Sequence, residues 1–154
     1  MRRLGVFLAT FGYVGYAPVA PGTFGSAAGL ALYALVHLSG SLAVEAAAIV
    51  AVFLIGIWSG TIAEEHFGGV DPPPVVIDEV VGTLITLFGV PVNVGGALAG
   101  FFLFRVSDVI KPFPAGRFEA LPGGLGVMAD DGMAAVYANL ALRAAVWLWP
   151  VLLT

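Results

Sequence analysis

The sequence predicts an all-α integral membrane helical bundle, and its composition is the first reason. Hydrophobic residues make up 60% of the 154 residues, charged residues only 10%, and the mean hydropathy is +1.01. A soluble domain carries about 25% charged residues because its surface faces water. Six Lys and Arg with ten Asp and Glu are too few for such a surface, which argues against a soluble monomer. The length suits a single membrane-embedded domain, residues 1–154.

The distribution of charge is the second reason. Twelve of the 16 charged residues fall in two segments, 64–79 and 105–131, and the stretches 4–44, 46–63 and 80–104 carry no charge. Residues 132–154 contain only Arg143. About 20 apolar helical residues cross a bilayer, so these stretches are candidate membrane segments. Arg2, Arg3 and the following apolar run resemble a signal peptide, but glycines and prolines interrupt the run, and we interpret it as mature sequence.

The elements follow in order along the chain. We expect helices near residues 25–44 and 45–63, then a polar loop marked by Gly68-Gly69 and Pro72–Pro74. Asp78 and Glu79 suit the positive end of the helix dipole and are expected to open the next helix. A Gly/Pro/Asn cluster at 89–93 interrupts that apolar stretch, and a second helix is expected over about 96–110, stopped by Pro112. Asp130 and Asp131 are expected to open the last helix.

These elements imply a topology. Arg2 and Arg3 favour a cytoplasmic start by the positive-inside rule, and two spans then return residues 64–79 to the cytoplasm. A short helical hairpin over 80–104 brings residues 105–131 to the same side. We therefore expect a multi-pass protein of the bilayer with its active-site loops on the cytoplasmic face.

Five carboxylates are the candidate metal ligands, and they lie at or near three expected helix ends. Such a group repels itself unless cations or protons neutralise it. Oxygen ligands without cysteine or histidine suit Mg²⁺ or Mn²⁺. The ligands expected are Asp78, Glu79, Asp108, Asp130 and Asp131.

Cationic side chains near the carboxylates indicate a site that handles phosphate. They are Arg105, Lys111 and Arg117. The hydroxyls of Thr23 and Ser26, beside Gly22 and Gly25, could hold a phosphate at a helix N-terminus or could belong only to a turn. Any single carboxylate could also be a helix cap or a wet loop charge, as we expect for Glu64, Glu65 and Glu119. Two adjacent acidic pairs at a membrane boundary favour function, because their burial is costly.

Four segments together resemble the phosphatidylglycerophosphatase A family. They are APVAPGTFGS (17–26), DPPPVVIDEVVG (71–82), FRVSDVIKPFP (104–114) and GGLGVMADDGMAA (123–135), in the family's order. Ala135 stands where the family pattern leads us to expect glycine. The resemblance implies a multi-pass enzyme of the bacterial cytoplasmic membrane, in phospholipid synthesis. It implies Mg²⁺-dependent hydrolysis of the terminal phosphomonoester of phosphatidylglycerophosphate, which yields phosphatidylglycerol and phosphate.

The resemblance also suggests roles for individual residues. Asp108, Lys111 and Asp131 are expected to be catalytic, with the five carboxylates as metal ligands. Substrate binding is expected of Arg105, Arg117, Thr23 and Ser26. The nucleophile is either water or a carboxylate that forms an aspartyl-phosphate, and the metal count and oligomeric state stay open.

Other classes of function fit less well. The net charge of −4 argues against a nucleic-acid partner, and the absence of cysteine excludes a Cys-based phosphatase. Residues 131–134 match the start of the DGxxA pattern of CDP-alcohol phosphotransferases, but Ala135 stands where that pattern has an arginine. The main alternative is a small ion-coupled transporter, which would place the carboxylates in mid-span.

Overall fold

A computed structural model describes residues 1–118 and 120–154, and these residues form helices and no strand. Glu119, expected to be a solvated loop charge, lies outside the described residues. The all-α prediction is confirmed. The helices are α1 (Arg2–Ala9), the 3₁₀ turn η1 (Val14–Tyr16), α2 (Pro21–His37), α3 (Leu42–Phe67), α4 (Ile77–Leu87), α5 (Val94–Ile110), α6 (Ala115–Phe118), α7 (Gly124–Leu148) and α8 (Pro150–Leu153).

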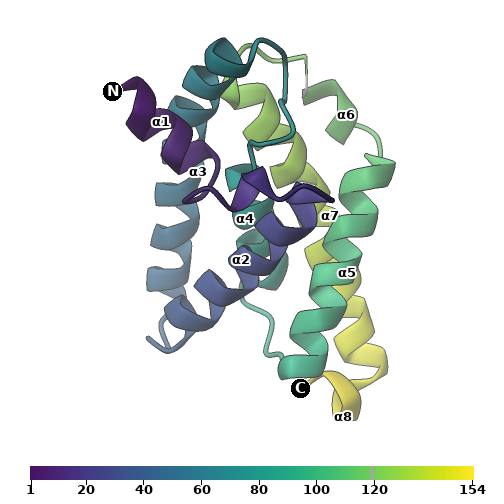
Figure 1. Cartoon of the computed structure of the whole chain (residues 1–154). Coiled ribbons are helices and arrows are strands. Elements are labelled where there is room, and N and C mark those ends of the chain that lie inside the picture. The colour runs from purple at the N-terminus through teal and green to yellow at the C-terminus, as the bar shows by residue number, and fades with distance from the viewer. Residues whose placement is uncertain (119) are drawn as a thin grey trace.

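The short helix α4 forms the centre of the molecule. It packs against α7 on one side and α2 on the other, while α3 and α5 lie at opposite flanks (Figure 1). Nine of its eleven residues are buried, including Val80, Val81, Leu84 and Leu87. A helix that is apolar on most of its circumference is stable only when other helices surround it. The carboxylates at its N-terminus are therefore held inside the bundle.

The sequence placed the boundary between the first two long helices wrongly. The expected helices, 25–44 and 45–63, are replaced by α2 ending at His37 and α3 beginning at Leu42. Ser39, Gly40 and Ser41 form the break, and Gly40 has a φ of 63°, a left-handed value that glycine adopts without strain. A long uncharged stretch concealed this short break, residues 38–41.

The expected hairpin is present as α4 and α5. Gly89, with a φ of 63°, helps to turn the chain after α4, and the Asn93 side chain accepts a hydrogen bond of 2.9 Å from the Gly96 amide to cap α5. The start of α5 at Val94 lies close to the expected residue 96. Because α4 and α5 run in opposite directions, segments 64–79 and 105–131 lie at the same end of the molecule (Figure 1). We call this the charged end.

The opposite end carries few charges, and each has a partner. Glu45 lies 2.8 Å from His37 Nδ1, and Arg143 donates to the Phe88 carbonyl over 3.1 Å. The Asn139 amide donates to three carbonyls at the end of α4, those of Ile85, Thr86 and Phe88. These contacts satisfy carbonyls that a helix end leaves open.

Helix α3 is, within the described part of the chain, the one helix long and apolar enough to cross a membrane. It has 26 residues and a mean hydropathy of 2.2 over its most apolar window, of which only 17% is buried. Val50, Leu54, Ile55 and Trp58 are exposed along it. The other helices do not meet the same test, so the multi-pass bundle and its cytoplasmic face stay predictions.

Candidate active site

The first turn of α4 supplies two carboxylates. Asp78 and Glu79 open this helix, as the sequence predicts. The loop before them is fixed because the Val76 amide donates to the Ala9 carbonyl of α1 over 2.9 Å. Asp78 is 4% exposed, so the surrounding bundle removes this carboxylate from water.

Helix α7 supplies two more carboxylates, but not at its start. It begins at Gly124, so the expectation that Asp130 and Asp131 open it is wrong; they lie almost two turns inside. The early start has a packing cause: a Cβ on Gly124 would lie 2.3 Å from the Ile57 carbonyl, and the Gly124 amide donates to Thr61 Oγ1 over 3.0 Å. The glycine-rich segment thus forms the contact of α7 with α3 instead of a loop.

Asp78, Glu79 and Asp131 come together as one group. One carboxylate oxygen from each lies within 4.8 Å of the others. Asp78 Oδ1, Glu79 Oε2 and Asp131 Oδ2 are buried and accept no hydrogen bond from the described residues. A buried carboxylate without a donor is costly unless it is protonated or binds a cation. Oxygen donors at this spacing fit a divalent metal ion, so the group could hold one.

Burial changes the acidity of the group. The pKa of Asp78 lies well above its usual range because of burial first and the Glu79 charge second. Burial also raises the pKa of Glu79, to about 8, with the charge of Asp131 as the next cause; Asp78 and Arg105 act in the opposite direction. Without a cation, these carboxyls therefore retain protons that exposed carboxyls lose.

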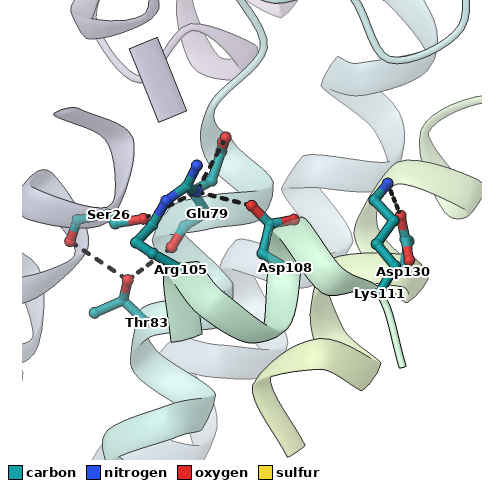
Figure 2. A network of polar contacts seen from close by, with 7 residues as sticks. All are labelled: Ser26, Glu79, Thr83, Arg105, Asp108, Lys111 and Asp130. Carbon is teal, nitrogen blue, oxygen red and sulfur yellow. Dashed lines mark hydrogen bonds and ion pairs between the residues drawn. The ribbon is translucent and has the colours of Figure 1, made fainter. Parts of the chain in front are cut away.

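Arg105 lies beside the carboxylate group and links three helices. Its Nη1 is 2.9 Å from Asp108, 3.7 Å from Glu79 and 3.5 Å from Ser26 Oγ (Figure 2). The pKa of Asp131 is raised by burial first, then by the charges of Asp78 and Asp108. A cation next to several acids can bind a phosphate oxygen while the acids hold a metal.

The N-terminal part of α2 approaches this group closely because it presents glycines. A Cβ on Gly22 would lie 2.2 Å from Glu79 Oε1 and 3.0 Å from Arg105 Nη2. A Cβ on Gly25 would lie 2.7 Å from the Val76 Cβ. The close approach brings Ser26, which is fully buried, to Arg105.

Thr83 is a positioning residue that the sequence did not single out. Its hydroxyl lies 2.9 Å from the Glu79 carbonyl and 3.3 Å from the Ser26 carbonyl (Figure 2). It thereby ties α4 to α2 one turn after Glu79. Its position one helical turn after Glu79 could have pointed to this role. A threonine within an apolar run, however, is also typical of ordinary core packing.

Lys111 and Asp130 form a second polar contact, apart from Arg105 (Figure 2). Asp130 is 3% exposed and pairs with the lysine ammonium, and it is not in the three-carboxylate group. Adjacent residues on a helix point about 100° apart, and the packing of α7 turns Asp130 toward Lys111 and Asp131 toward Asp78 and Glu79. Lys111 ends α5 with a φ of 47°.

Comparison with known proteins decides the family. The model of the phosphatidylglycerophosphatase A family matches residues 7–146. A phosphatidylglycerophosphatase A of Haemophilus influenzae is 36% identical over 127 residues, covering 81% of this chain and 78% of that protein. The Escherichia coli protein of that name is 32% identical over 140 residues, covering 89% and 80%. This chain belongs to the phosphatidylglycerophosphatase A family.

Another relative has a different name. A Bacteroides thetaiotaomicron protein, provisionally assigned as a phosphatidylinositol-3-phosphatase, is 39% identical over 140 residues, 86% of this chain and 87% of that protein. All three names describe enzymes that remove a phosphate from a lipid. No solved structure matches the chain.

Two residues expected to bind substrate lie apart from the three-carboxylate group and Arg105. Thr23 is exposed on the first turn of α2. Arg117 is exposed on α6, with its guanidinium 4.8 Å from the centre of the Phe113 ring. Of the expected site residues, the structure thus gathers Asp78, Glu79, Asp131, Arg105, Asp108 and Ser26, and pairs Lys111 with Asp130 nearby.

Proposed function

We propose that this protein is a Mg²⁺-dependent phosphatase that converts phosphatidylglycerophosphate into phosphatidylglycerol and phosphate. The observation that supports it most is the group of three carboxylates beside Arg105, each with one buried oxygen that accepts no hydrogen bond from the residues the structure describes. A cation stabilises carboxylates that lie close together, and a cation beside an arginine attracts a phosphate monoester.

In this proposal Asp78, Glu79 and Asp131 hold Mg²⁺. When bound, the ion neutralises charge on the phosphoryl oxygens and lowers the pKa of water. Arg105 binds a phosphate oxygen, and Asp108 holds its guanidinium in place through the 2.9 Å contact. Lys111 reaches a second phosphate oxygen or the leaving oxygen once the phosphate displaces it from Asp130.

Hydrolysis then requires one P–O bond to form and one to break. Water attacks phosphorus, a carboxylate takes the water proton, and the bond to the terminal glycerol oxygen breaks, with a proton delivered to that oxygen. In this proposal Asp131, a member of the three-carboxylate group, and Asp108, held at Arg105, carry out the proton transfers. Attack by an aspartate instead of water is the alternative first step.

We also infer a multi-pass position in the bacterial cytoplasmic membrane, with the charged end at the cytoplasmic surface. The apolar exposed side of α3 would face acyl chains, while a headgroup reaches the carboxylates from the water side. The ion-coupled transporter has less support, because the carboxylates lie at the charged end of the molecule and the relatives are named as phosphatases.

The substrate is tested by phosphate release from a lipid panel. The purified protein, with Mg²⁺, is offered phosphatidylglycerophosphate, phosphatidylinositol 3-phosphate and phosphatidic acid at equal concentration in mixed micelles. We expect the highest kcat/KM with phosphatidylglycerophosphate. A preference for the phosphoinositide, as the name of the Bacteroides relative suggests, would change the proposed substrate but not the proposed reaction. No phosphate release from any of the lipids would contradict the proposed function.

A further inference from the structure

A cavity lies at the charged end of the molecule, and the carboxylate group does not line it. It has a volume of about 660 Å³ and lies between α1, η1 and the end of α3. Its lining combines cationic, aromatic and hydroxyl-bearing side chains, and the proposed chemistry uses none of them. The lining residues are Arg2, Arg3, Val6, Tyr13, Tyr16 and His66.

The two arginines in this cavity are available to a ligand. The other four cationic residues of the chain have partners: Arg105 and Lys111 pair with acids, Arg117 stacks on Phe113, and Arg143 caps α4. Arg2 and Arg3 are exposed, and neither forms an ion pair with any residue that the structure describes. Two adjacent guanidinium groups in a hollow favour an anion with several oxygens, such as a phosphate.

Three lining residues, Tyr13, Tyr16 and His66, belong to a chain of aromatic ring contacts. Phe7 contacts Tyr13 with ring centres 5.2 Å apart, Tyr13 contacts Tyr16 at 5.8 Å, and Tyr16 contacts Phe67 at 6.2 Å. Phe67 contacts His66 at 4.8 Å. Aromatic rings with polar tips collect at the level of lipid headgroups, where one end of the ring is apolar and the other is wet.

The backbone fixes the most exposed of these rings. Tyr13 has a left-handed φ of 72°, and its amide donates to Thr10 Oγ1 over 3.2 Å. Tyr13 and Tyr16 are 58% and 51% exposed, so their hydroxyls are accessible to a ligand. The cavity therefore presents arginines and tyrosine hydroxyls together.

We propose that this cavity binds the phosphate-bearing headgroup of an anionic phospholipid as a site separate from the catalytic one. The guanidinium groups of Arg2 and Arg3 bind the phosphate oxygens, the tyrosine hydroxyls and His66 contact the glycerol or inositol portion, and the acyl chains stay in lipid along α1. The inference does not depend on the proposed catalytic function, since it concerns binding alone.

The experiment measures equilibrium binding of radiolabelled short-chain phosphatidylglycerol to the full-length protein in nonionic detergent. EDTA is present, so that no divalent ion at the three-carboxylate group can attract the lipid phosphate. The variant is the double substitution Arg2→Gln/Arg3→Gln, and its matched control is Arg2→Lys/Arg3→Lys, which preserves both charges. Circular dichroism checks that each variant is as helical as the wild type.

We expect the Gln variant to bind the lipid about tenfold more weakly or worse, since each cation near an anionic lipid contributes to binding, and the Lys variant to stay close to wild type. Short-chain phosphatidylcholine and inorganic phosphate should compete poorly. Unchanged binding in the Gln variant would overturn the site. Equal competition by inorganic phosphate would overturn the lipid assignment, since it would reveal a site for free phosphate. Because the experiment measures binding and no turnover, its result is independent of whether the protein hydrolyses phosphatidylglycerophosphate.

Discussion

Asp130 and Asp131 are adjacent in α7, yet their side chains have different partners. Asp131 joins Asp78 and Glu79, whereas Asp130 pairs with Lys111. Both are almost fully buried, at 3% and 5% exposure. A helix turns about 100° per residue, so the orientation of α7 decides which of its two adjacent acids faces the other carboxylates, whereas Asp78 and Glu79, in the first turn of α4, both reach them. The sequence showed an acidic pair; only the packing of α7 shows which member faces the other two carboxylates.

Asp131→Asn should lower phosphate release by at least about 10²-fold, because it removes a negative charge from the group that balances the cation. The substitution keeps the shape of the side chain, so the melting temperature should not fall. Release is measured under substrate saturation, with Glu65→Gln as a control at an exposed acid outside the group. Wild-type activity in Asp131→Asn would remove this residue from the site.

The raised pKa of Glu79 predicts how stability depends on pH. Its folded pKa of about 8 exceeds the ordinary value of 4.5, so between these values the native state binds more protons than the unfolded state. Stability therefore falls as pH rises through this window. In EDTA, the melting temperature should decrease from pH 5 to pH 9, and Mg²⁺ should reduce the decrease. A flat profile in EDTA, or the same slope in Glu79→Gln, would show that this carboxyl is not perturbed.

At the scale of elements, the contact of α2 with α4 depends on missing side chains. Gly22→Ala would place a methyl group 2.2 Å from Glu79 Oε1, so the carboxylate or α2 must shift. A shift of about 1 Å at a catalytic group costs on the order of 10²-fold in rate. The variant should remain helical but lose activity by about that factor. Gly69→Ala is the matched control, since no atom lies within 4 Å of its added Cβ; equal activity in both variants would contradict the account.

Elements marked by local signals could be predicted, and those shaped by packing could not. The Gly/Pro/Asn cluster and the Asn93 cap identify the start of α5 nearly to the residue. Helix α7 starts earlier than expected because Gly124 contacts the backbone of α3, a partner about 60 residues away in the sequence. Composition likewise could not distinguish the turn at Gly40 from continued helix.

The same distinction holds for the candidate site. Residue types and their order were enough to predict Asp78, Glu79 and Asp131, because acids are rare in this chain. Which side of a helix is turned toward the site decides why Thr23 and Arg117 are exposed. It also decides why Thr83 can tie α4 to α2. Facing is set by how the helices pack, which the sequence alone does not give.

For the whole molecule, the hairpin topology predicts that both charged segments, 64–79 and 105–131, lie on the same side of the membrane. The chain contains no cysteine, so single cysteines report cleanly. Gly69→Cys and Ala120→Cys, both exposed at the charged end, should react with a membrane-impermeant thiol reagent from the cytoplasmic side. Ser39→Cys, in the turn between α2 and α3, should react from the other side. Labelling of Gly69→Cys and Ala120→Cys from opposite sides would contradict the hairpin topology.

The proposed function requires that Asp78, Glu79 and Asp131 hold a divalent ion for hydrolysis of a lipid phosphomonoester. It is tested most directly by phosphate release from phosphatidylglycerophosphate after EDTA treatment, measured as Mg²⁺ is restored. We predict no release in EDTA and a saturable return of activity with Mg²⁺ in the wild type, but not in Asp131→Asn. Full activity in EDTA, or no activity at any Mg²⁺ concentration in folded protein, would contradict the claim.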